Sequence, residues 1–144
     1  MQMKTSKEVL SSLLKTTQMG QIGIRSVLDT TMQPGLRSAL MDQLKEYDAI
    51  ETEAHAIASQ RGWEPKELDP AVRFMADRMT RIKLTGRHSD SRIAAMMVQG
   101  NTRGMIKGLK NLHHMKAPDN RVQILSQKLL DCENANIRQM HQFL

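Results

Sequence analysis

The residues that come closest to a metal site are one histidine and two glutamates. Glu51 and His55 lie four residues apart, so a helix would present both side chains on one face, and Glu133 could approach them from the last helix. Imidazole and carboxylate groups are ligands that zinc and iron accept. Because Glu/His pairs at this spacing are common on exposed helices, hydrogen bonding is the favoured interpretation, and a residual metal site is the alternative.

A second group of residues could bind phosphate. Residues 71–118 hold 10 Lys and Arg against 2 Asp and Glu. The favoured interpretation of this excess is a solvated helix face, and the alternative is a surface for an acidic partner or a nucleic acid. Aromatic residues make up only 3% of the chain, which disfavours a protein that stacks single-stranded bases. The candidate polyanion contacts are Arg92, Arg103, Lys107 and Lys110.

Length and cysteine content narrow the class of protein. A chain of 144 residues can bury its own core, so we expect a single domain over residues 1–144. One cysteine, Cys132, excludes an internal disulfide and fits a reducing compartment. No apolar run is long enough for a signal peptide or a membrane span. We therefore expect a cytoplasmic protein with no membrane contact.

The elements that must position these residues are all helices. Thr5 and Glu8 form a capping box, Pro34 fits the first turn of a second helix, and Gly62 is typical of a helix end in the left-handed conformation. Apolar residues then recur at steps of three and four. The expected helices are residues 6–30, 34–61, 70–85, 90–115 and 119–143.

Glycines inside these helices need a compensating interaction, because each costs about 1 kcal/mol relative to alanine. The short turn before Pro34 makes the first two long helices antiparallel, and residues 70–85 can serve as a crossover. The helix at 90–115 would then run antiparallel to the first. We expect their backbones to approach closely, with Gly20 and Gly23 facing Gly100 and Gly104, and with Gly108 continuing the strip.

Several short stretches resemble known families. A group of uncharacterised ferritin-like helical bundle proteins from spore-forming bacteria is similar at Gln18-Met19-Gly20, at Leu36 to Gln43 with Tyr47, at Gly62-Trp63, and at Met96 to Gly100 with Gly104. The run from Thr30 to Pro34, Leu36-Arg37 and Gly62-Trp63 is also similar to the spore coat protein F family. The resemblance implies an all-α, ferritin-like four-helix bundle with a long helical crossover between helices two and three.

The metal ligands of ferritin-like enzymes are missing from this sequence. Those enzymes take one glutamate from each of two helices and a Glu-x-x-His motif from each of the other two. Here Asn136 follows Glu133 where the histidine would stand. We expect no di-metal centre and no cofactor, and we expect the inner polar residues to form a hydrogen-bonded core network. Its members would be Gln18, Gln43, Tyr47 and Gln99.

The function expected from these observations is not catalysis. We expect a ferritin-like bundle without a di-metal site, acting as a homo-oligomer in a structural or accessory role during sporulation or stress, and spore association would accompany that role. The first alternative is a module that binds polyanions or nucleic acid through residues 71–118. The second is a residual metal-binding protein that uses Glu51, His55 and Glu133.

Overall fold

The first helix begins where the capping box places it. The computed structural model, which describes residues 3–84 and 89–144, shows the Thr5 hydroxyl accepting from the Glu8 amide while the Glu8 carboxylate accepts from the Thr5 amide. All the described secondary structure is helical apart from one isolated bridge between Lys4 and Met115. The helices are α1 (Ser6–Val27), α2 (Pro34–Arg61), α3 (Pro70–Lys83), α4 (Asp90–His113) and α5 (Asn120–Met140), followed by a 3₁₀ turn at His141–Phe143.

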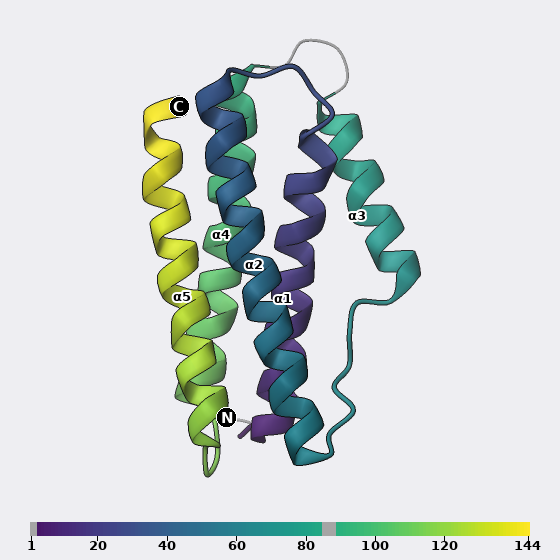
Figure 1. Ribbon diagram of the computed structural model, residues 1–144, viewed down its shortest axis with the longest axis vertical. Helices are drawn as coiled ribbons and strands as arrows, with labels where there is room; N and C mark the ends of the chain where they lie inside the picture. The colour runs from purple at the N-terminus through teal and green to yellow at the C-terminus, as the bar shows by residue number, and fades with distance from the viewer. Residues whose placement is uncertain (1–2, 85–88) are drawn as a thin grey trace.

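The four long helices pack as two antiparallel hairpins (Figure 1). One hairpin is α1 with α2, and the other is α4 with α5. The hairpins meet where α1 packs against α4 and α2 packs against α5. In the chain, α3 connects the two hairpins, and it packs along the outer side of α1. None of the α3 side chains between residues 70 and 83 is buried, so α3 covers the bundle without contributing to its centre.

The buried core is mainly aliphatic, as expected from a sequence with few aromatic residues. Residues at helical spacing turn one face of each long helix inward, and removal of this apolar surface from water stabilises the bundle. Tyr47 is the one aromatic side chain among the fully buried core residues that the structure describes. The largest core residues with no exposed surface are Leu10, Leu14, Leu36, Leu40, Ile50, Ile57, Ile93 and Met140.

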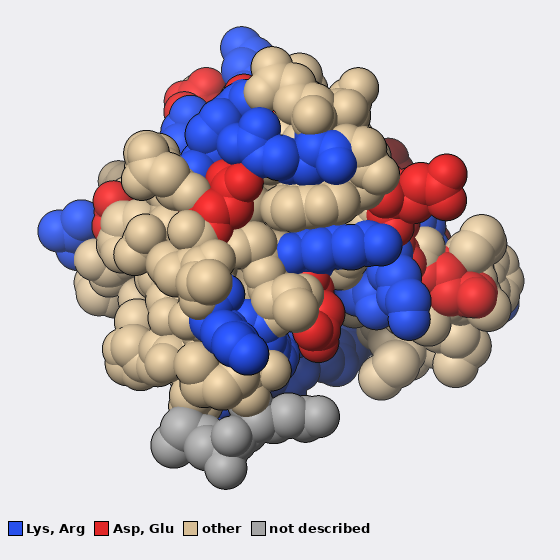
Figure 2. Space-filling view, turned by 90° about the horizontal axis from the view of Figure 1, so that it is seen from below, with Lys and Arg blue, Asp and Glu red and all other residues tan. Residues whose placement is uncertain are grey.

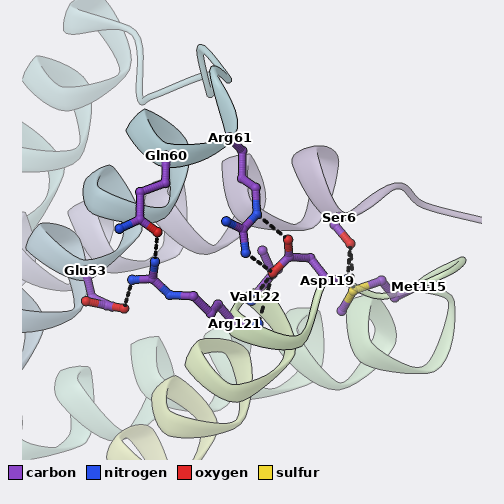
Figure 3. Close-up of polar contacts among 8 residues, drawn as sticks. All are labelled: Ser6, Glu53, Gln60, Arg61, Met115, Asp119, Arg121 and Val122. Carbon is purple, nitrogen blue, oxygen red and sulfur yellow. Dashed lines mark hydrogen bonds and ion pairs between the residues drawn. The ribbon is translucent and has the colours of Figure 1, made fainter.

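Polar contacts connect α2 with α5 at the end of the bundle where α2 ends and α5 begins (Figure 3). Asp119 caps α5 by accepting from the amides of Arg121 and Val122, and its other oxygen lies 2.6 Å from Arg61 on α2. This ion pair holds the pKa of Asp119 below its ordinary value. Basic and acidic side chains are interleaved on this end rather than gathered into one basic patch (Figure 2). The arrangement joins the two hairpins at their ends.

Several predicted helix boundaries are wrong by two or three residues. The first helix ends at Val27 rather than near residue 30, because Arg37 binds the carbonyl oxygens of Leu28 and Thr30 and so turns the chain. The fourth ends at His113 rather than 115, because the backbone of the next residues pairs with Lys4. The last helix, α5, ends at Met140 rather than at residue 143, and α3 ends at Lys83. Residue 85, its predicted end, lies outside the described residues.

Candidate functional site

A cavity of about 410 Å³, open to solvent on one side, lies between α1, α3 and α4. Four of the five glycines that were predicted to pack closely line it, two from α1 and two from α4. The cavity therefore opens at the place where the sequence suggested that two helix backbones would meet. The lining glycines are Gly20, Gly23, Gly100 and Gly104.

The predicted glycine contact between α1 and α4 is wrong. A Cβ added at Gly23 or Gly100 would have no heavy atom within 4 Å, and Gly100 is exposed. The other three glycines make room for side chains of neighbouring helices instead. A Cβ at Gly20 would lie 2.6 Å from the Tyr47 ring, one at Gly104 would overlap Glu133 Oε2, and one at Gly108 would lie 3.0 Å from Leu130.

The inner end of the cavity is polar. The Tyr47 hydroxyl of α2 donates to Asn101 Oδ1 of α4 over 2.8 Å, and Asn136 of α5 donates to the same oxygen over 3.3 Å. Asn101 in turn donates to the backbone carbonyl of Met97. Burial raises the pKa of the Tyr47 hydroxyl far above its ordinary value, so this group stays protonated and remains a donor.

Glu133 lies beside this network without joining it. Its side chain is 2% exposed and lines the cavity, yet its Oε1 atom has no hydrogen-bond partner among the described residues. Burial raises its pKa to about 8, so at neutral pH the carboxyl is mostly protonated. Gln43 Oε1 is a second buried, unpartnered acceptor on the cavity wall. Such unsatisfied polar atoms are rare in folded proteins and each needs an explanation.

The prediction that Gln18, Gln43, Tyr47 and Gln99 form one core network is wrong. Gln18 points away from the cavity floor and donates to Glu51 and Glu67, while its own oxygen accepts from the Leu68 amide. Gln43 donates to Gln139 rather than to another predicted member. Gln99 is exposed and so cannot belong to a core network. Gln99 lies two residues after Met97 and two before Asn101, both buried, so it points to the opposite side of α4.

The mouth of the cavity is basic and its walls are largely apolar. Four cationic side chains line the cavity, and we place them at its opening because three are exposed and the fourth, Lys15, is half-buried. They are Lys15 of α1, Lys83 of α3, and Arg103 and Lys107 of α4, and none of the four makes an ion pair or hydrogen bond that the described residues show. Asn101 and Glu133 lie on the opposite, inner side in buried surroundings. The apolar wall residues are Met19, Ile22, Ile24, Leu68, Ala76, Met96 and Met97.

The predicted metal-ligand set does not assemble. Glu51 and His55 do come together, but Glu67 of the α2–α3 connection is their neighbour, and ligand atoms of these three lie within 4.8 Å of one another. Glu133 is buried at the cavity floor instead. His55 and Glu67 are exposed, and the amide of Gln18 already binds both carboxylates. Its donation lowers the pKa of Glu51 and uses lone pairs that a cation would need.

Sequence reasoning missed Lys15 and Lys83 at the opening, and it also missed two polar residues, Asn101 and Glu67. Asn101 lies on the inward face of α4, three residues before Gly104 and four after Met97, and this spacing could have identified it. Glu67 stands in a connection without helical periodicity, so no pattern in the sequence indicated its position. The helix periodicity is thus informative only for residues inside the regular elements.

Fold and site together define an all-α protein with a partly polar cavity inside its helical bundle. No family model matches the chain, and the search of curated proteins gives no match. Among described residues no helix is both long and apolar enough to cross a membrane.

Two solved structures share the fold. A conserved hypothetical protein, Rv2844, from Mycobacterium tuberculosis has a TM-score of 0.74 and 14% identity, covering 96% of this chain and 96% of that chain. A DUF305 fragment from Deinococcus radiodurans has a TM-score of 0.75 and 15% identity, covering 95% and 93%. At such identities the likeness shows the helical fold alone. Neither description refers to ferritins or spore coats, so those resemblances stay predictions.

Proposed function

We propose that this protein binds a small amphipathic organic anion in the cavity between α1, α3 and α4. The observation that carries the proposal is the combination of a cavity of about 410 Å³, a wall of aliphatic and methionine side chains, and four cationic side chains at the opening. Small-molecule sites are usually concave, mostly apolar, and roughly 300–1,000 Å³ in volume. The aliphatic chain of the ligand would lie along the wall, with its carboxylate beside Arg103 and Lys107.

The charges at the opening favour an anion over a neutral ligand. Lys15, Lys83, Arg103 and Lys107 come from three helices and line the same cavity. Cations held near one another repel, and an anionic ligand group relieves this repulsion. The gain is modest for exposed groups, about 1 kcal/mol or less for each pair. Burial of the apolar chain at about 25 cal/mol per Å² supplies the larger share of affinity.

Isothermal titration with decanoate tests the proposal. A ligand of this size is expected to bind with one site and a Kd on the order of 10⁻⁴ M, from roughly 0.4 kcal/mol per non-hydrogen atom. Lys107→Gln is expected to weaken binding about threefold and to reduce its salt dependence. The matched control is Lys45→Gln, because Lys45 is an exposed lysine of α2 that does not line the cavity.

A second variant tests whether binding occurs inside the cavity. Gly23→Leu would fill the space beside Gly23, where an added Cβ meets no atom within 4 Å, so the fold should tolerate it. We expect this variant to keep the circular dichroism spectrum of the wild type, to unfold at the same or a slightly higher temperature, and to lose most decanoate affinity. Equal affinity in wild type and Gly23→Leu, or no binding to the wild type, would refute the proposal.

A polyanion surface is the second candidate function, favoured by the alignment of cations on α4. Successive residues rotate by 100°, so Arg92, Arg103, Lys107 and Lys110 lie within about 60° of one another and span about 27 Å of helix axis. A duplex DNA bound there should lose affinity steeply as salt rises. Fluorescence anisotropy with a labelled duplex measures this, and no binding at low ionic strength would exclude this candidate.

The architecture also supports the broader hypotheses drawn from the sequence. A ferritin-like bundle whose centre holds a ligand cavity in place of a di-metal site would be non-catalytic, and α3 would be its crossover helix. Assembly into a homo-oligomer is part of the same hypothesis. The accessory role in sporulation or stress and the cytoplasmic or spore location rest on the family resemblance.

A further inference from the structure

Two buried acceptor atoms in the cavity have no donor. Gln43 Oε1 and Glu133 Oε1 both lack a hydrogen-bond partner among the described residues, and each side chain is 2% exposed. They come from α2 and α5, and both residues line the same cavity. Leaving a buried acceptor unsatisfied costs about 1–3 kcal/mol. Two such atoms in one cavity therefore need a common explanation.

The hydrogen bonds that the neighbouring donors make go to other acceptors. The Tyr47 hydroxyl and the Asn136 amide both donate to Asn101 Oδ1, and the Asn101 amide donates to the backbone. The Gln43 amide donates to Gln139. None of these bonds reaches Gln43 Oε1 or Glu133 Oε1, so a molecule that enters the cavity can supply the missing donors.

We propose that the ligand carries a protonated amine at its inner end, received by Glu133 and Gln43, in addition to the anionic group at the basic opening. This inference rests on the proposed function and narrows the ligand to a zwitterion with an apolar middle. An ammonium group offers three donors and no acceptor, which matches two acceptor atoms without donors. A hydroxyl group offers a single donor, so it can satisfy only one of the two oxygens.

The groups that face Glu133 determine how binding depends on pH. Tyr47 of α2 and Cys132 of α5 are its titratable neighbours, and Lys15, Arg103 and Lys107 lie on the wall of the same cavity. Burial raises the pKa of Glu133 to about 8 and that of Cys132 to about 11, so neither is mainly ionised at pH 7. An ammonium group favours the carboxylate, so its binding expels the proton of Glu133 into solution.

Calorimetry with three probes of equal chain length tests the inference. Decanoate, ω-hydroxydecanoate and ω-aminodecanoate share the carboxylate and the apolar chain and differ only at the far end. At pH 8 we expect the amino compound to bind about tenfold more tightly than the hydroxy compound, because a charge-assisted hydrogen bond is stronger than a neutral one. Titration in two buffers of different ionisation enthalpy should show proton release with the amino compound and none with decanoate.

Variants at the inner end separate this inference from the proposed function. We compare the affinity for the amino compound with the affinity for the hydroxy compound. Glu133→Gln is expected to reduce this ratio to about one, and Gln43→Met is expected to reduce it partly. Glu46→Gln, which replaces an exposed glutamate outside the cavity, should keep the ratio. If decanoate binds but the amino compound binds no better than the hydroxy compound, the inference fails and the proposed function stands. If no probe binds, both fail.

Discussion

Glu133→Gln is expected to stabilise the folded protein by about 3–5 kcal/mol at pH 9 and to change its stability little at pH 4. The reason is that the wild-type carboxyl is buried at 2% exposure without a hydrogen-bond partner for Oε1, so ionisation is unfavourable in the folded state. The variant carries a neutral amide at every pH and avoids that cost.

The sign of this pH dependence follows from the two pKa values. Burial raises the pKa of Glu133 from 4.5 to about 8 in the folded protein, whereas the unfolded chain keeps the ordinary value. Below pH 4.5 the group is protonated in both states and contributes nothing. Between the two values the folded state holds a proton that the unfolded state has lost, so stability falls by about 1.4 kcal/mol per pH unit. Above pH 8 both states are ionised and the loss is complete.

Chemical denaturation at pH 4, 7 and 9 measures this difference in unfolding free energy. Glu46→Gln is the matched control, because Glu46 is exposed, and its effect should be small and should show no steep rise with pH. A Glu133→Gln variant with the same unfolding free energy as the wild type at pH 9 would contradict the prediction, because it would mean that Glu133 ionises freely in the folded state.

A buried acid that destabilises the fold is understandable at a binding site. Carboxyls with strongly shifted pKa values cluster at functional sites, where proteins keep arrangements that cost stability. Glu133 fits this pattern, since it lines a cavity that also holds a second unsatisfied acceptor, Gln43. The cost in stability and the selectivity for an amine would then have the same origin, which is the desolvated carboxyl.

The helices could be predicted from the sequence because their signals are local. Thr5 with Glu8 and Asp69 with Pro70 start helices through contacts within one turn, and Gly62 ends α2 at a φ of 67°. The boundaries that were wrong depend on distant residues. Arg37 ends α1 by binding carbonyls that lie seven and nine residues earlier in the chain.

The candidate site could not be predicted in the same way, because it depends on how the helices pack. A glycine in a helix can admit another backbone, admit a side chain or border a cavity, and the sequence pattern is the same in all three cases. Gly23 and Gly100 border the cavity, whereas Gly20 admits Tyr47. Glu133 was also identified from the sequence, but the sequence could not show that it lies in the cavity, away from Glu51 and His55.

Gly20→Ala is expected to destabilise the protein by about 2–3 kcal/mol, whereas Gly23→Ala on the same helix should stabilise it by about 0.5–1 kcal/mol. A Cβ at Gly20 would lie 2.6 and 2.8 Å from two atoms of the Tyr47 ring, which is buried and hydrogen-bonded to Asn101. A Cβ at Gly23 meets no atom within 4 Å, so only the gain in helix propensity remains. Thermal and urea unfolding of the two variants measure the difference.

A double-mutant cycle shows whether the Tyr47 ring is the cause. In a Tyr47→Val background the ring is absent, so Gly20→Ala should become neutral or slightly stabilising, like Gly23→Ala. Tyr47→Val itself is destabilising because it leaves a cavity and removes the hydrogen bond to Asn101, so the comparison is made within that background. If Gly20→Ala costs the same free energy in both backgrounds, the close approach of α1 to Tyr47 is not what requires glycine at this position.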